Sequence, residues 1–173
     1  MEVHIRRAVA EDAAALALVA QATFLDTYAH MIPVADMLAF CRGEHGEARY
    51  AAWLADAACR IWLAEAAATG APVGYALVSP PDLPVPTDAG DLELKRIYAL
   101  RRTHGSGLGS RLMREAVQAA TAAGARRLLL GVHSGNVRAL SFYARQGFVQ
   151  AGVRKFRVGG QVYDDLVLAR RLP

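Results

Sequence analysis

Cysteine and lysine are scarce in this 173-residue chain, and each scarcity excludes a class of protein. The two cysteines, Cys41 and Cys59, are too few for a disulfide framework and lack the CxxC spacing of a zinc or redox site. Of the 20 basic residues only Lys95 and Lys155 are lysines, and the arginines are scattered instead of forming one basic block. We therefore expect reduced, structural thiols and no nucleic-acid partner.

A long hydrophobic run is also absent. No stretch of about 18 uncharged apolar residues occurs, so no membrane-spanning helix is expected. The first residues, MEVHIRRAVAED, carry charge from the second position and lack the apolar core of a signal peptide. We therefore expect a cytoplasmic protein that does not bind membranes.

Metal-ligand patterns are missing as well. His4, His30 and His45 are far apart in the sequence, and neither HExxH nor CxxC occurs. We predict no metal. A fourth histidine, His133, follows an apolar run and is expected to be a strand-end residue more readily than a catalytic base.

Hydrophobic residues make up 54% of the chain and charged residues 21%, which is enough for one domain with a sizeable core. We expect a single domain spanning residues 1–173. The net charge of +4 suggests an anionic ligand, although a generic basic surface would give the same balance.

Hydrophobic periodicity, with glycine and proline as turn signals, predicts a mixed α/β domain. The expected order is a strand at 3–7, a helix to about 28, one or two helices over 34–57 interrupted near Gly43 and Gly46, a hairpin of strands 59–66 and 72–79, a proline-rich loop at 80–90, a strand at 91–100, a helix ending at Gly124, a strand at 127–132, a helix at 136–146, and a hairpin of 148–158 and 161–170.

The strand at 91–100, DLELKRIYAL, is expected to alternate strictly between two faces. One face would carry Leu92, Leu94, Arg96 and Tyr98, and the other Glu93, Lys95, Ile97 and Ala99.

A glycine-rich run, HGSGLGS from His104 to Ser110, joins that strand to the next helix. Glycines allow positive φ and remove the Cβ atoms that would hold a phosphate away, while the first N–H groups of the helix point at the anion. A Walker A loop is excluded because neither lysine follows a glycine, and GxGxxG fails at Ser110 and Leu112. A GxSxG nucleophile elbow fails at His104. A plain strand-to-helix turn stays open at this point.

A second motif, NVRALSFYARQGF from Asn136 to Phe148, makes the pattern more specific. Together with ELKRIYALRRTHGSGLGSRLM it resembles the GCN5-related N-acetyltransferase (GNAT) family. That family's pyrophosphate loop reads Gln/Arg-x-x-Gly-x-Gly/Ala, and its later helix reads Asn-x-x-Ala-x-x-x-Tyr before Gly-Phe. The resemblance implies an α/β fold with a mixed, largely antiparallel sheet flanked by helices. It also implies an acetyl-CoA-dependent N-acetyltransferase.

The resemblance implies a set of acetyl-CoA-binding residues. The backbone N–H groups of the glycine run would hold the pyrophosphate, the strand before it would pair with the pantetheine arm, and Asn136 would hydrogen-bond the same arm. His104 departs from the motif, because a neutral histidine donates one hydrogen bond where the family has glutamine or arginine. The implied residues are Ile97, Tyr98, Ala99, His104, Gly105, Ser106, Gly107, Leu108, Gly109, Ser110 and Asn136.

Two further residues are implied for the chemistry. Acetyl transfer needs a neutral amine and a proton for the departing thiolate. Glu93 matches the catalytic glutamate of histone-type members and is predicted as the base, acting directly or through water. Tyr143 matches the family's proton donor. Alternatively, Glu93 is a salt-bridge partner of Lys95 or Arg96, and Tyr143 is a core tyrosine with a satisfied hydroxyl.

The acceptor pocket is expected to be formed by the first helices and the loop at 80–90. The segment ATFLDTYAHMIP, residues 22–33, loosely resembles bacterial spermine/spermidine acetyltransferases, which implies Asp26 and Tyr28 as substrate-binding residues for a cationic amine such as a polyamine. Loop aspartates that only cap turns are the alternative. Two other functions stay open, a protein N-terminal or lysine acetyltransferase and a non-catalytic acyl-CoA-binding sensor. The resemblance is also compatible with a homodimer, in which the terminal hairpin supplies an interface.

Overall fold

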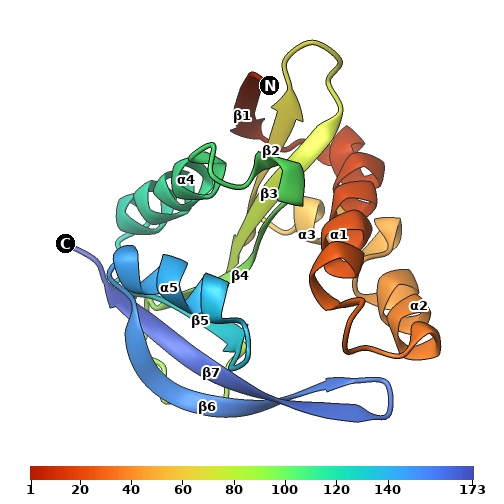
Figure 1. Ribbon diagram of the computed structural model, residues 1–173. Coiled ribbons are helices and arrows are strands. Elements are labelled where there is room, and N and C mark those ends of the chain that lie inside the picture. Colours follow the sequence, from red (N-terminus) through yellow and green to blue (C-terminus); the bar gives the residue numbers. More distant parts are fainter.

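The predicted strands assemble into one seven-stranded sheet in a computed structural model that describes residues 1–173 (Figure 1). The strand order is β1-β2-β3-β4-β5-β7-β6, and every neighbouring pair is antiparallel except β4 and β5. The expected mixed, largely antiparallel α/β fold is confirmed. In chain order the elements are β1 (Val3–Arg7), the 3-10 turn η1 (Ala10–Asp12), α1 (Ala13–Tyr28), α2 (Val34–Gly43), α3 (Glu47–Ala55), β2 (Arg60–Ala66), β3 (Pro72–Ser79), β4 (Leu92–Ala99), the 3-10 turn η2 (Arg101–Thr103), α4 (Leu108–Ala122), β5 (Arg127–His133), α5 (Val137–Arg145), β6 (Val149–Val158) and β7 (Gln161–Arg171).

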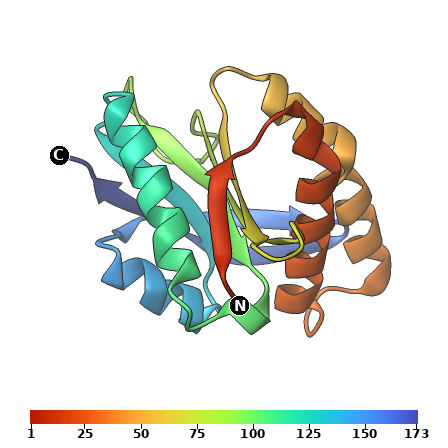
Figure 2. The same cartoon turned by 90° about the horizontal axis from the view of Figure 1, so that it is seen from above.

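Helices cover both faces of this sheet, with α4 on one side and α1 on the other (Figure 2). The larger core packs Leu112 and Met113 of α4 against Leu128 of β5. The second core packs Leu16 of α1 against Leu77 of β3. None of the helices is both long and apolar enough to cross a bilayer. The apolar faces of the predicted helices therefore pack against the sheet.

The parallel pair at the centre of the sheet is very short. β4 pairs with β5 only at Leu92–Leu128 and Glu93–Leu129, whereas β5 continues along β7 as far as His133. The two strands therefore separate after Glu93. We call residues 94–99 of β4, which have no partner on the β5 side, the open edge.

A β-bulge in β4 overturns the predicted strict alternation. Leu94 pairs with Val78 and Arg96 with Leu77, so Lys95 is an extra residue on this strand. As a result Leu94 and Ile97 both pack in the core under α4. The opposite face of the sheet receives both Glu93 and Arg96, which strict alternation would have separated.

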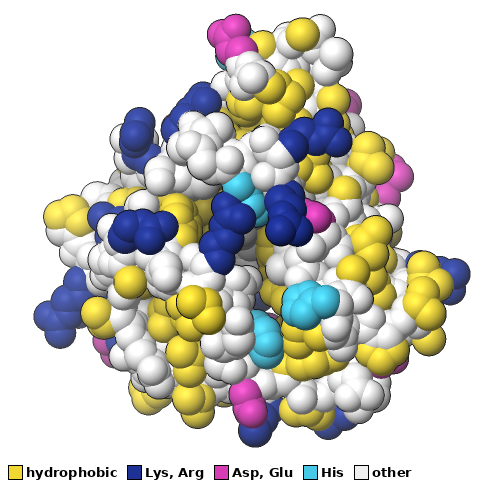
Figure 3. Space-filling model, in the orientation of Figure 1, with side chains coloured by type: hydrophobic (Ala, Val, Ile, Leu, Met, Phe, Trp, Pro, Cys, Tyr) yellow, Lys and Arg dark blue, Asp and Glu magenta, His cyan; other side chains and the backbone are white.

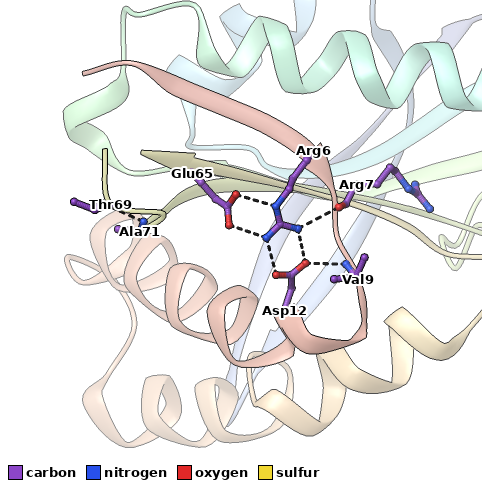
Figure 4. Close-up of polar contacts among 7 residues, drawn as sticks. All are labelled: Arg6, Arg7, Val9, Asp12, Glu65, Thr69 and Ala71. Carbon is purple, nitrogen blue, oxygen red and sulfur yellow. Dashed lines mark hydrogen bonds and ion pairs between the residues drawn. The ribbon is translucent and has the colours of Figure 1, made fainter. Parts of the chain in front are cut away.

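The N-terminal strand is fixed by one arginine that holds two carboxylates (Figure 4). Arg6 donates to both oxygens of Asp12, at 2.7 and 2.8 Å, and to both oxygens of Glu65, at 2.9 and 2.7 Å. The N–H of Val9 also donates to Asp12 at 2.7 Å. These contacts join β1, η1 and β2. The Arg6 guanidinium lowers the pKa of Asp12, against the opposing effect of burial.

Replacing this carboxylate should have a pH-dependent effect on stability. We expect Asp12→Asn to lower the free energy of unfolding by about 1 kcal/mol at neutral pH, because Arg6 is partly exposed and screened. A lowered folded-state pKa contributes stability above the unfolded pKa of about 4, and that stability is lost as the pH falls through the folded value. Urea unfolding of both proteins from about pH 7 to about pH 3 should show the difference shrinking in acid.

The exposed Asp26, which has no ion-pair or hydrogen-bond partner, provides the matched control. Asp26→Asn should leave the unfolding curve unchanged. An Asp12→Asn difference that stays constant into acid would contradict the assigned pair.

Candidate functional site

The glycine loop, which we define as residues 104–110, leads into helix α4. Two of its glycines adopt the left-handed backbone conformation. Gly105 has φ +84° and Gly107, the N-cap of α4, has φ +81°. A Cβ atom at either position would meet no other atom within 4 Å, so space is open above the loop. The N–H groups of Gly107, Leu108 and Ser110 have no acceptor in the chain, because the first turn of a helix lacks internal partners. Unpaired N–H groups at the N-terminus of a helix can bind an anion.

Two side chains of this loop, His104 and Ser106, bond to the backbone just before it and stabilise it. Ser106 Oγ donates to the Thr103 carbonyl at 2.6 Å, and Thr103 donates to Leu100 at 2.7 Å. His104 Nε2 donates to the Ala99 carbonyl at 3.0 Å. The residue that departs from the family motif therefore anchors the loop to the end of β4. Arginine and lysine side chains gather around a hollow on this face (Figure 3), which favours an anionic ligand.

The open edge presents backbone groups that β3 does not use. The N–H of Leu100 donates to the Val73 carbonyl at 2.9 Å. Because antiparallel pairs alternate in hydrogen bonding, Ile97 and Ala99 direct their backbone groups away from β3. On that side β5 has already diverged. An extended chain with amide groups could add there as a short strand.

Helix α5 lies beside both features. Asn136 is its N-cap, and its Oδ1 accepts the Ala139 N–H at 3.0 Å, which leaves the side-chain NH2 free to donate. Phe142 lies against Gly109, where an added Cβ would make ordinary contact at 3.6 Å. Tyr143 is 9% exposed, and burial raises the pKa of its hydroxyl. That hydroxyl has no hydrogen-bond partner within the chain, unlike the satisfied core tyrosine weighed as an alternative.

Glu93 is 3% exposed at the point where β4 leaves β5. Its Oε2 accepts the backbone N–H of Asp82 at 2.8 Å and lies 3.4 Å from Lys95 Nζ. Of the two expected salt-bridge partners, Lys95 is therefore the one that Glu93 contacts. The other carboxylate oxygen accepts no hydrogen bond.

One pocket spans the separated strands, and we call it the aromatic pocket. Its lining includes the predicted residues Tyr28, Glu93 and Tyr98. The neighbouring Tyr98 hydroxyl and burial raise the pKa of Tyr28, with a smaller contribution from Tyr143. The remaining lining comes from α1, α2 and the segments after them, and from β4, β5, β6 and β7: Phe24, Met31, Ile32, Phe40, His45, Lys95, Arg96, Gly131, His133, Arg154, Phe156, Val158, Tyr163 and Asp165.

Two parts of the chain that were expected to form the acceptor pocket do not line this one. Asp26 is exposed on α1 and does not line it. The loop at 80–90 contributes no lining residue either. Instead Asp82 supports Glu93 through its N–H, and Asp88 and Asp91 both pair with Arg127, at 3.8 and 2.5 Å. The carboxylates of Asp88 and Asp91 therefore have a structural role, in line with the alternative stated for this loop.

Several lining residues were not predicted from the sequence. Asp165 accepts Arg154 Nε and Nη2 at 3.1 and 2.9 Å, and burial raises the pKa of its carboxyl. His133 Nδ1 is buried without a hydrogen-bond partner and lies 3.9 Å from Asp165. The alternation of β7 could have indicated an inward Asp165, but not its neighbours. These three residues lie on β5, β6 and β7, and the sequence alone does not show that the three strands meet at the pocket.

His45 lies at the inner wall of the pocket. Its Nδ1 is 3.1 Å from the Tyr50 hydroxyl, which in turn donates to Tyr75 at 3.0 Å. Burial lowers the pKa of His45 to about 3, so this ring is neutral. No group of three His, Cys, Asp or Glu side chains is arranged to hold a metal ion.

Together these parts fit coenzyme A. The glycine loop presents unpaired N–H groups to a diphosphate, the open edge suits the amide-bearing pantetheine arm, and Asn136 has a free donor beside it. The aromatic pocket meets the end of this path at Tyr98. A second substrate would therefore reach the reactive end of the arm from the opposite side.

Known proteins agree with this arrangement. The acetyltransferase (GNAT) family matches residues 27–148. An N-acetyltransferase of Mycobacterium tuberculosis, described as uncharacterised, is 35% identical over 161 residues, which cover 93% of this chain and 98% of the relative. Among solved structures, the PaiA N-acetyltransferase from Thermoplasma acidophilum in complex with coenzyme A has a TM-score of 0.81 at 20% identity, with 99% of each chain covered. The ribosomal-protein-S18-alanine N-acetyltransferase from Escherichia coli has a TM-score of 0.71 at 17% identity, covering 99% of this chain and 94% of that one. At these identities the two structures support the fold alone.

The family match covers most of the chain, and it includes the glycine loop and the helix with Asn136 and Tyr143. The chain therefore belongs to the acetyltransferase (GNAT) family and is an acetyl-CoA-dependent N-acetyltransferase.

Proposed function

We propose that this enzyme acetylates the primary amine of a small molecule bound in the aromatic pocket, by direct attack of the amine on the thioester. One observation carries the proposal: the pocket is lined by both separated strands and adjoins the open edge. An amine in the pocket and an acyl group on the open edge would then meet without an intervening protein nucleophile.

The donor would be held mainly by backbone. The N–H groups from Gly105 to Ser110 would bind the pyrophosphate, Ile97 and Ala99 would pair with the pantetheine arm, and Asn136 would donate to it. Acetyl-CoA supplies an activated acetyl thioester there. His104 contributes by anchoring the loop to Ala99, so its lack of a guanidinium matters less to binding than the motif alone suggests.

Proton transfer would be divided between two side chains. Glu93 has one carboxylate oxygen free and would accept a proton from the acceptor ammonium, directly or through water, since only a neutral amine has a lone pair. Tyr143 keeps its proton at neutral pH because burial raises the pKa of its hydroxyl. It would donate that proton to the leaving thiolate.

Thiol release from acetyl-CoA with a panel of amines tests this proposal. Spermidine, small aromatic and aliphatic amines and short peptides should be compared at equal concentration. We expect at least one small amine to accelerate thiol release above the rate with water alone. If no amine does so while coenzyme A still raises the melting temperature, the chain is a sensor and the proposal fails. A clear preference for peptides would establish a protein acetyltransferase instead.

Removing the Tyr143 hydroxyl should separate chemistry from binding. Tyr143→Phe should lower kcat by about 100-fold, because only the proton for the leaving thiolate is lost. The melting temperature and its rise with coenzyme A should hardly change, since this hydroxyl has no partner within the chain.

Tyr50→Phe is the control, because its hydroxyl is bonded to His45 and Tyr75. It should lower the melting temperature and leave kcat close to that of the native enzyme. Similar kcat values for Tyr143→Phe and Tyr50→Phe would exclude the proposed donor.

A side chain on the glycine loop should abolish donor binding. Gly107→Val forces a β-branched residue into φ +81° and fills the open space above the loop. Calorimetry should then show no binding of coenzyme A. Gly70 has φ +70° and equally open surroundings, but lies in the turn between β2 and β3. Gly70→Val should therefore cost similar stability and retain binding, and loss of binding in both variants would contradict the assignment.

A further inference from the structure

We infer that the acceptor is a small amine that also carries a carboxylate and an aromatic or apolar body, and that Arg96 selects it. This inference rests on the proposed function and names the substrate class of the same pocket. It replaces the polyamine expected from the segment at 22–33.

The walls of the pocket are aromatic and come from three separate elements. Phe24 of α1 and Phe40 of α2 are stacked with ring centroids 4.7 Å apart. Phe156 of β6 meets Phe40 edge-on at 6.0 Å. Tyr28 adds a ring tilted against Phe24 at 5.0 Å. Such walls favour an apolar or planar body over a long polar chain.

The charges that line the pocket favour an anionic group. Its two carboxylates, Glu93 and Asp165, are already paired, with Lys95 at 3.4 Å and Arg154 at 2.9 Å. Arg96 is a third cation with no carboxylate of its own within the lining. A polycation would therefore find both carboxylates already paired, with the free oxygen of Glu93 available to one ammonium group alone, and would meet an excess of positive charge.

The guanidinium of Arg96 lacks acceptors for some of its N–H donors, although only 15% of the side chain is exposed to solvent. Nη1 donates to the Lys95 carbonyl at 3.0 Å, and Nε is buried without any acceptor. Its nearest acid, Glu44, lies outside the pocket at 3.8 Å from Nη2 and bonds Arg49 at 2.5 Å. A buried guanidinium with spare donors gains most from a carboxylate, which can accept two of them at once.

The bulge in β4 places this group at a useful distance from the proposed base. Lys95 is the extra residue, so Glu93 and Arg96 face the same pocket three positions apart. Their partners on β3, Ser79 and Leu77, are two positions apart, so at about 3.3 Å per residue the backbones of Glu93 and Arg96 lie about 7 Å apart along the strand. A molecule of amino-acid size can place its amine toward Glu93 and its carboxylate toward Arg96.

The experiment compares primary amines that carry or lack an anionic group, with kcat/KM expressed per neutral amine because the amine of the amide is less basic than that of the free amino acid. L-phenylalanine, L-phenylalanine amide and 2-phenylethylamine share one aromatic body, and spermidine represents the polycations. We expect kcat/KM for phenylalanine to exceed that for its amide by at least about tenfold, because one charged hydrogen-bonded contact is lost. Spermidine should be the poorest acceptor.

Variants assign the preference to Arg96. Arg96→Gln should reduce the ratio of phenylalanine to its amide to about one, while Arg96→Lys should keep part of it. A ratio is insensitive to the amount of folded enzyme, and the melting temperature with coenzyme A reports the fold of each variant separately. Arg42→Gln, at an exposed arginine in the last turn of α2, should leave the ratio unchanged.

The outcomes separate this inference from the proposed function. Acetylation of amines with the amide or spermidine preferred would overturn the carboxylate class and leave the proposed function intact. A native preference that survives Arg96→Gln would overturn the role of Arg96. If no amine accelerates thiol release, the proposed function itself fails.

Discussion

The early separation of β4 from β5 is the constraint on which the rest of the site depends. If β4 and β5 remained paired to their ends, the backbone groups of Ile97 and Ala99 that point away from β3 would be bonded to β5. No gap would then separate the two strands. Because pairing ends at Glu93, the sheet offers an unpaired strand on one side and a pocket on the other. The sheet stays intact because β5 is paired along its whole length with β7, and β4 with β3.

The bulge in β4 and the glycine loop determine which chemical groups lie at this opening. The bulge brings Glu93 and Arg96 to one face and leaves Leu94 and Ile97 to hold α4 in place. The loop then begins α4 with unpaired N–H groups at the end of the same strand. The proposed acetyl-CoA site and the aromatic pocket therefore share one strand, β4. Helices α1 and α2 add aromatic walls to the pocket.

Much of the fold could be predicted because its signals are local. Glycines at turns and apolar spacing located the strands and helices, and the glycine loop and Asn136 lie on the elements expected for them. The bulge could not be predicted, because the residues of β4 alone do not reveal which of them lacks a pairing partner on β3. The resemblance implies both Asp26 and Tyr28 at the acceptor pocket, yet residues two apart on a helix face different directions. The pocket's charge balance depends on Arg154 and Asp165, which reach it only through tertiary packing.

Hydrogen exchange of backbone amides with and without coenzyme A tests the central claim most directly, namely that the open edge and the glycine loop form one donor site. The account predicts that coenzyme A slows exchange at Ile97 or Ala99 and at Gly107 to Ser110 together, because both groups of N–H lack partners in the free protein. Amides of β2 should be unaffected, since they are already paired on both sides. Binding of coenzyme A that protects the loop but leaves the open edge unchanged would contradict it.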